Sequence, residues 1–217
     1  MDRTVYLSAD CSRGLSAWLA EECGCRIEFI HTEGIVAGPV SDHPDMFMCR
    51  LGAGDGAPVI RCSDLSTLSE TYPYDIPWNA ACTGRYFIHN LRYTAPQLLE
   101  TAREVGCVMI DVRQGYAKCS TVIVDEDSVI TYDRGIAGSC LAAGMNVLTV
   151  RPGHVLLPGY DTGFIGGASG RVGDTVIFNG DLSSHPDFDR ITGFISSRGL
   201  RIKWFEEWPL TDIGSIY

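Results

Sequence analysis

The chain has 217 residues, of which 45% are hydrophobic, and a formal net charge of −10. That length suffices for one large domain with a full apolar core, or for two small ones. The acidic balance argues against a nucleic-acid backbone or an anionic membrane surface as partner.

Targeting signals are not evident in the chain. No uninterrupted apolar run approaches the roughly 18 residues that a membrane span needs. The opening "MDRTVYLSAD" lacks a basic stretch followed by an apolar one, so it does not read as a secretory signal. We therefore expect a cytoplasmic protein.

Nine cysteines occur, an odd number, and none lies after Cys140. Most sit beside aliphatic residues, as in "CVMIDV" and "GSCLAAG", where cysteine behaves as a small hydrophobe. A disulfide framework rarely has this distribution, so we expect reduced thiols. Cys23 and Cys25 form a C-x-C pair without a second paired cluster, so no metal site is expected.

The first predicted elements are a strand at residues 4–9, a helix at 11–24 and a strand at 26–31. Leu15, Trp18, Leu19 and Cys23 recur at helical spacing, and Gly24 is a suitable residue to end the helix. After a stretch rich in Gly and Pro, "MFMCRL" and "PVIRC" are predicted to form a hairpin through "GAGDGA". Asp64 is predicted to cap a short helix after it.

The central part of the chain repeats one order of elements: strand, turn, strand, helix, strand. In "WNAACTGRYFIHN" Thr83 and Gly84 mark a tight turn, and the helix "TAPQLLETAREVG" follows, with Thr94 as its expected N-cap. "CVMIDV" closes that unit. The same order is predicted for "STVIVDEDSVITYDRGIAGSCLAAGMNVLTV" and for residues 163–205, and "TDIGSIY" is left as a lone short strand.

Recurring units with one apolar face bury that face only against their neighbours. The first unit lacks a strand and the chain ends with a spare one, so ring closure by the last strand would remove exposed sheet edges. We therefore predict a single domain over residues 1–217, a five-bladed α/β propeller of ββαβ units with a central channel. An open α/β sheet of βαβ units is the alternative, which hairpins before the helices disfavour.

Several phrases resemble an uncharacterised bacterial family with the pentein fold of guanidino-group-modifying enzymes. They are "HPDMFMCRLG", "YPYDIPWNAACTGRYFIHNLRYT", "QGYAKCSTVIVDEDSVITYDRGI" and "GYDTGFIGGASG". The resemblance covers residues 41–217. It implies the pentein propeller, which deiminases and amidinotransferases share with a ribosome-binding initiation factor.

Enzymes of the pentein fold use a cysteine nucleophile, a histidine and two carboxylates on a guanidinium group. Their H-x-D-x-x-F pattern matches residues 159–164, which keep Asp161 and Phe164 but have Gly159 at the histidine position. Their C-terminal cysteine would fall in "DIGSIY", which has none. The usual catalytic His and Cys are therefore not in place.

Polar residues lead into an apolar strand at equivalent places in the predicted units, so a ring would bring them together at the channel. We predict Cys119, His43 and Asp161 as catalytic residues. The predicted ligand-binding residues are Asp42, Asp45, Asp75, Asn79, Lys118, Tyr160 and Asp212.

Cys119 is the favoured nucleophile because the cation of Lys118 beside it can lower the thiol pKa. His43 could act as its base. The alternative for Cys119 is a buried structural cysteine. The alternative for His43 is a turn residue, since His-Pro-Asp recurs at residues 185–187, where it is expected to start a helix.

The carboxylates at these positions suit a small cationic ligand such as a guanidinium or an amine, unless they serve as turn and cap residues. No cofactor is expected, because a strand rather than a helix follows the Gly-rich "GFIGGASGRVGD". Three hypotheses stay open: a guanidino-modifying enzyme with a relocated nucleophile, a non-catalytic ligand-binding module, and a protein-interaction module. The oligomeric state is not indicated.

Overall fold

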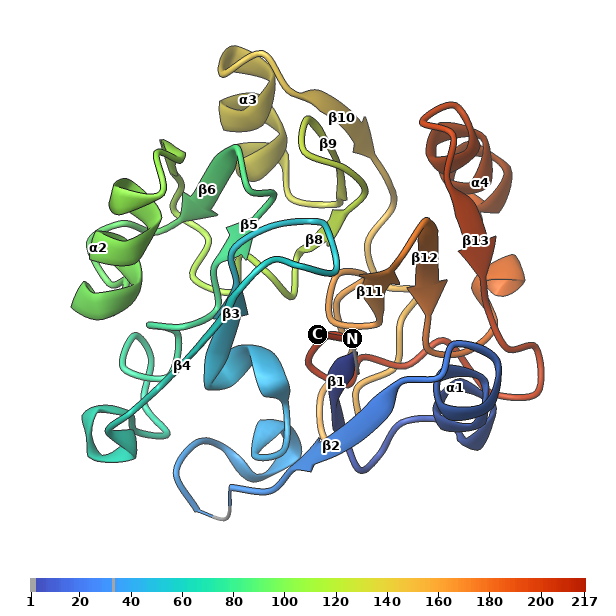
Figure 1. Cartoon of the computed structure of the whole chain (residues 1–217), viewed down its shortest axis with the longest axis horizontal. Coiled ribbons are helices and arrows are strands. Elements are labelled where there is room, and N and C mark those ends of the chain that lie inside the picture. Colours follow the sequence, from blue (N-terminus) through green and yellow to red (C-terminus); the bar gives the residue numbers. More distant parts are fainter. Residues whose placement is uncertain (1–2, 33) are drawn as a thin grey trace.

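The computed structural model of the chain describes residues 3–32 and 34–217. Four α-helices lie at the outside of the molecule, and the strands lie nearer its middle (Figure 1). The α-helices are α1 (Arg13–Ala17), α2 (Pro96–Glu104), α3 (Arg134–Ala142) and α4 (Phe188–Ser196). A π-helical turn, η1 (Trp18–Glu22), continues α1, and the 3₁₀ turns are η2 (Gly38–Val40), η3 (Pro44–Met46), η4 (Leu65–Thr67) and η5 (Leu182–Ser184).

Thirteen strands are found in the described part of the chain, and they form five separate sheets. Two sheets are two-stranded: β1 (Thr4–Ser8) with β2 (Arg26–Ile30), and β3 (Met48–Arg50) with β4 (Val59–Arg61). Three sheets have three strands each. They consist of β5 (Ala81–Cys82), β6 (Tyr86–His89) and β7 (Val108–Asp111); β8 (Thr121–Ile123), β9 (Ser128–Thr131) and β10 (Asn146–Thr149); and β11 (Ser169–Val172), β12 (Thr175–Phe178) and β13 (Arg201–Lys203).

The three larger sheets are built alike. In each, the first two strands form an antiparallel hairpin, a helix follows, and the third strand pairs parallel to the middle strand. All residues of the middle strands β6, β9 and β12 are buried, because other parts of the chain cover both of their faces. Runs such as "TVIF" in β12 are typical of strands buried on both faces.

The prediction of a five-bladed propeller is wrong. The strands form five small sheets of two or three strands, and no sheet closes into a barrel or propeller within the described residues. Residues 211–217 do not form the predicted closing strand. They make two isolated bridges, Leu156 with Thr211 and Gly170 with Ile216, and a single pair of backbone hydrogen bonds to β1. Positive φ angles at Gly214 (69°) and Ser215 (76°) interrupt the extended backbone that a longer ladder needs.

The C-terminal segment, residues 211–217, runs through the middle of the molecule, and all seven of its residues are buried (Figure 1). Two backbone hydrogen bonds join Tyr217 to Tyr6 in β1, with N···O distances of 2.7 and 3.2 Å. Ile213 and Ile216 pack in an apolar cluster with Val5, Leu7 and other residues. This segment therefore carries its polar side chains, Asp212 and Ser215, into the interior.

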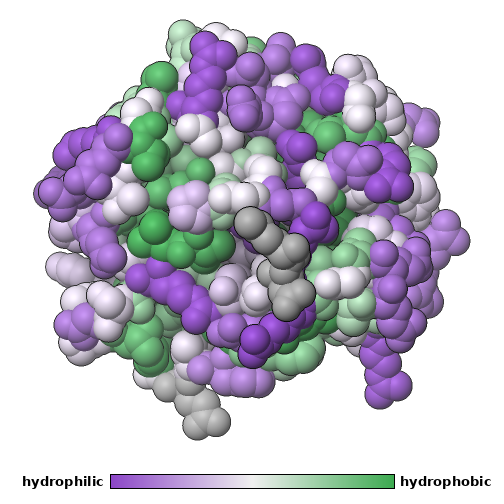
Figure 2. Space-filling view, in the orientation of Figure 1, coloured by the Kyte–Doolittle hydropathy of each residue, from purple (hydrophilic) through white to green (hydrophobic). Residues whose placement is uncertain are grey.

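Polar residues predominate at the rim of the face shown in Figure 2, and apolar residues gather in patches between the rim and the middle. None of the helices in the described residues is both long enough and apolar enough to cross a membrane. All nine cysteines are free thiols.

Candidate functional site

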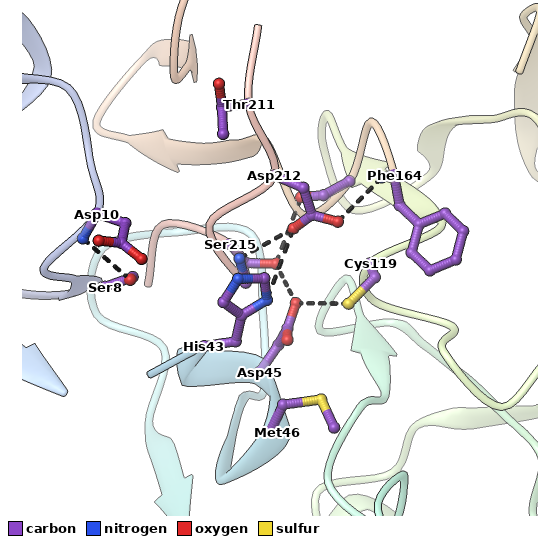
Figure 3. Close-up of polar contacts among 12 residues, drawn as sticks. Ser8, Asp10, His43, Asp45, Met46, Cys119, Phe164, Thr211, Asp212 and Ser215 are labelled. Carbon is purple, nitrogen blue, oxygen red and sulfur yellow. Dashed lines mark hydrogen bonds and ion pairs between the residues drawn. The ribbon is translucent and has the colours of Figure 1, made fainter. Parts of the chain in front are cut away.

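A cluster of buried polar side chains lies where the sheets meet. It joins residues that are far apart in the sequence: His43 and Asp45 at η3, Cys119 just before β8, and Asp212 and Ser215 in the C-terminal segment. These side chains point toward one another (Figure 3). Each is at most 5% exposed, so their mutual contacts, rather than water, determine their chemistry.

The thiol of Cys119 is held by two polar partners. Its Sγ lies 3.0 Å from Oδ2 of Asp45 and 3.0 Å from Nδ2 of Asn79. The Asn79 Oδ1 atom accepts the backbone N–H groups of Lys118 and Cys119, which fixes the turn before β8. Burial raises the pKa of the Cys119 thiol well above its usual range, with the Asp45 and Asp212 carboxyl groups adding to the effect. The predicted activation of this thiol by Lys118 is thus outweighed.

A chain of hydrogen bonds runs from Asp45 to Lys118. The Ser215 hydroxyl donates to Oδ2 of Asp45 at 2.7 Å, and Nζ of Lys118 donates to Oγ of Ser215 at 2.8 Å. Nζ also donates to the Gly166 carbonyl oxygen at 3.1 Å. Burial raises the pKa of Asp45 and lowers that of Lys118, because it disfavours the charged form of each. The second Asp45 oxygen, Oδ1, is buried without a hydrogen-bond partner.

His43 and Asp212 form the second half of the cluster, with Nδ1 and Oδ1 3.8 Å apart. The Asp212 carboxylate accepts the backbone N–H groups of Gly214 at 3.0 Å and Phe164 at 2.9 Å. Burial nevertheless raises the pKa of Asp212 to about 6 and lowers the pKa of His43. The pair therefore combines a neutral imidazole with a carboxyl group that titrates near neutrality, a combination suited to moving protons.

Two glycines permit this packing. A Cβ atom on Gly214 would lie 2.1 Å from Cβ of His43, and one on Gly167 would lie 2.0 Å from Oδ1 of Asp212. Both approaches are too close for any larger residue. The backbone thus encloses the His43–Asp212 pair on these sides.

A pocket of about 850 Å³ leads from the surface to His43 and Asp212. Asp10, Cys11 and Arg13 form part of its wall together with apolar residues such as Leu157. Cys119, Asp45 and Lys118 do not line it, so the thiol lies behind the pocket floor. Three acidic residues, Asp10, Asp45 and Asp212, stand against two cations, Arg13 and Lys118, in or directly behind this pocket, which leaves an excess of negative charge.

The structure brings together six of the residues predicted for the site: His43, Asp45, Asn79, Lys118, Cys119 and Asp212. The other four lie elsewhere. Asp161 lines an adjoining acidic pocket of about 590 Å³, which shares Leu156, Trp208 and Pro209 with the first, and the neighbouring Tyr160 is half exposed. Asp42 accepts the backbone N–H of Thr32 and lies 3.7 Å from His31. Asp75 accepts the phenol hydroxyl of Tyr116 instead of joining the cluster.

Sequence reasoning missed the groups that surround the cluster. The N–H groups that hold Asp212 come from backbone, which no residue type reveals. Asp10 and Trp208 line the pocket, although they lie in segments without a recognisable motif. Ser215 is not among the missed groups, since the sequence places it with Asp212 among the polar positions of "TDIGSIY", but its bridging position between Asp45 and Lys118 follows from the turn at Gly214.

Within the described residues, no group of three or more His, Cys, Asp or Glu side chains is arranged to hold a metal ion. The six clustered residues instead offer a thiol, an imidazole, an ammonium and two carboxyl groups within one network. Such a network can bind a charged ligand and exchange protons with it.

Comparison with known proteins finds no matching curated protein and no matching solved structure. Nothing in these comparisons bears on the resemblance to the penteins. One family model matches residues 20–217, which is most of the chain and includes all six clustered residues. The chain therefore belongs to that family, the family of unknown function DUF6873.

Proposed function

We propose that the pocket ending at His43 and Asp212 binds a small cationic molecule of guanidinium or amine type. The observation that carries this proposal is the charge of the buried cluster, which has two carboxyl groups, Asp45 and Asp212, but one ammonium, Lys118. An uncompensated buried carboxylate is costly, and a cation is its natural partner.

Asp212 is the group that such a ligand meets, since it lines the pocket while Asp45 lies behind it. A cation beside Asp212 favours the ionised carboxylate and lowers its pKa. Protonation of Asp212 competes with the ligand, because its pKa is about 6 in the free protein. Affinity is therefore expected to fall as the pH drops below about 6.

A thermal-shift screen with agmatine, arginine, guanidinium and putrescine tests this proposal, because a ligand of the native state raises the unfolding midpoint. Asp212→Asn is expected to weaken binding at least tenfold. Asp161→Asn is the matched control, since it removes a carboxylate from the adjoining acidic pocket and not from the lining of the pocket at Asp212. Equal binding by the wild type and Asp212→Asn would contradict the proposal.

A second candidate function is modification of a guanidino group, with Cys119 as nucleophile. The observation that favours it is the contact between the Cys119 thiol and Asp45, a carboxyl group whose pKa is raised by burial. Asp45 would take the thiol proton, the sulfur would bond to the guanidinium carbon, and a nitrogen of that carbon would depart as ammonia or an amine with that proton, returned by Asp45 directly or through His43. Water would then attack the same carbon, and the Cys119 sulfur would leave and regain a proton. Because the thiol lies behind the pocket floor, this chemistry requires the ligand to pass His43.

Cys119→Ala separates the two candidates. If Cys119 is the nucleophile, the variant keeps the thermal shift with the guanidino ligand but loses release of ammonia or amine. Cys11→Ala is the control, because it removes a thiol from the pocket wall and leaves Cys119 in place. Unchanged turnover by Cys119→Ala would exclude the second candidate and leave the binding proposal intact.

A reducing compartment such as the cytoplasm fits this function. Support comes from the odd number of cysteines and from the burial of five of them, Cys25, Cys49, Cys82, Cys107 and Cys140, in apolar clusters. Titration of thiols in the unfolded protein isolated from its native source is expected to return nine per chain, and fewer would indicate disulfides.

A further inference from the structure

A second, much smaller hollow lies beside the C-terminal segment at Tyr217. Its volume is about 30 Å³, and it is lined by Arg50 of β3, Arg171 of β11, Lys118 and Tyr217 among others. A cavity needs about 10–15 Å³ of such space to hold one water molecule, so the hollow takes only one or two small molecules or ions. None of these residues lines the larger pocket at His43.

Two buried donors that line this hollow have no acceptor. They are Nε of Arg50 and the phenol hydroxyl of Tyr217, a residue that is 3% exposed. Buried donors are normally paired, so each unpaired donor requires an explanation. A single acceptor placed in the hollow would explain both.

Three cationic side chains also line this hollow, and of these Lys118 reaches a carboxyl group, that of Asp45, only through the Ser215 hydroxyl. Among the described residues, no carboxylate lies within ion-pair distance of Arg50, Arg171 or Lys118. The nearby Asp55 is already paired with Arg3 at 2.5 Å. Burial lowers the pKa of Arg50, which is the expected effect when no partner compensates the charge.

The other cations retain donors of their own. Arg171 donates through Nε to the Gly173 carbonyl and through Nη1 to the Val124 carbonyl, which leaves Nη2. Lys118 uses two of its three N–H bonds on Gly166 and Ser215. Its ammonium lies 5.7 Å from the centre of the Tyr217 ring.

We propose that this hollow binds one small monovalent anion, either free chloride or the carboxylate end of a small acid. The anion would accept hydrogen bonds from Nε of Arg50 and the hydroxyl of Tyr217 and would compensate the surrounding cations. A neutral water molecule would fill the space but leave the charge unbalanced. The hollow shares Lys118 with the buried cluster but has no lining residue in common with the cation pocket, and the proposal does not rest on the function of that pocket.

Thermal unfolding at constant ionic strength tests the site. Sodium gluconate is replaced stepwise by sodium chloride, since gluconate is too large for the hollow, and a parallel series uses sodium formate. The wild-type midpoint is expected to rise by about 3–5 °C at tenfold excess over Kd and to keep rising with the logarithm of the anion concentration. A rise with chloride alone identifies a halide site, and a rise with formate as well identifies a carboxylate site.

Arg50→Gln and Tyr217→Phe are expected to lose most of that rise. Arg198→Gln, which removes an exposed arginine on another part of the surface, is expected to retain it. If Arg50→Gln does not fold, Tyr217→Phe decides, because it removes only the hydroxyl group. The absence of a rise in the wild type, or the same rise in Tyr217→Phe, would overturn the proposal.

Discussion

At Asp212, opposing effects act on one carboxyl group. Burial raises its pKa, whereas the N–H groups of Gly214 and Phe164 and the ammonium of Lys118 lower it. Burial prevails, and the pKa reaches about 6. The charge of this residue, and with it the charge of the pocket floor, therefore changes within the physiological pH range.

This shift predicts a pH dependence of stability. An Asp in the unfolded chain has a pKa of about 3.9. Between about pH 4 and pH 6 the folded protein therefore binds more protons at Asp212 than the unfolded chain does, and the free energy of unfolding falls as the pH rises. The group thus destabilises the fold by up to about 3 kcal/mol above pH 6, and this loss is absent below pH 4.

Urea unfolding of the wild type and Asp212→Asn from pH 4 to pH 7 measures this effect. The difference in unfolding free energy, wild type minus variant, is expected to decrease by up to about 3 kcal/mol across that range. Other titrating groups are common to both proteins and cancel in the difference. A constant difference would show that the pKa of Asp212 is not raised.

At the scale of elements, short irregular segments position the site, while the regular helices and strands support them. His43 and Asp45 belong to the η3 turn, and Asp212 and Ser215 flank the left-handed Gly214. Because residues with positive φ redirect the chain within a few residues, the C-terminal segment presents both polar side chains to the same cluster.

Gly214→Ala is expected to destabilise the protein by about 2–4 kcal/mol. The added Cβ would lie 2.1 Å from Cβ of His43, so overpacking adds to the cost of a left-handed alanine. Gly199→Ala is the control: its φ is +74° and no atom lies within 4 Å of the added carbon, so about 1 kcal/mol is expected. Equal losses in urea unfolding would show that Gly214 does not closely abut His43.

The sequence predicts elements best where several local signals agree. The hairpin and helix of residues 121–142 have a polar turn, apolar strands and a capping aspartate, Asp133, whose side chain accepts the N–H of Ile136. Asp64 likewise caps η4, as predicted. Thr94 was the wrong cap for α2: its hydroxyl bonds His89, and the N-cap position is Ala95. A tertiary contact thus competes with the local preference.

At the scale of the whole molecule, the error in the predicted fold has a specific cause. A spare strand at the end of the chain suggested closure of a ring, but pairing depends on backbone angles that "TDIGSIY" does not reveal. Gly214 and Ser215 adopt left-handed conformations, so the segment forms isolated bridges instead of a ladder. The segment nevertheless runs through the middle of the molecule, so Asp212 lies near the other residues predicted around Cys119. Asp161, which was predicted in part from the resemblance to the penteins, lines the adjoining pocket instead.

The C-terminal segment is expected to hold the first and last sheets together. Ile213 is fully buried in the cluster that contains Leu7 of β1 and Ile177 of β12. Ile213→Ala should therefore lower the unfolding free energy by about 3 kcal/mol. Ile202→Ala, at a partly buried position in β13, should cost less. Similar losses for both variants in urea unfolding would contradict this role of the segment.

The central claim is that a small cation binds at Asp212, and isothermal titration at pH 7.5 tests it most directly. The titrant is the compound with the largest thermal shift, and the proteins are the wild type, Asp212→Asn and Asp161→Asn. We predict that Asp212→Asn weakens binding at least tenfold and that Asp161→Asn binds as the wild type does. Loss of binding in Asp161→Asn with retention in Asp212→Asn would assign the ligand to the other acidic pocket and contradict the account.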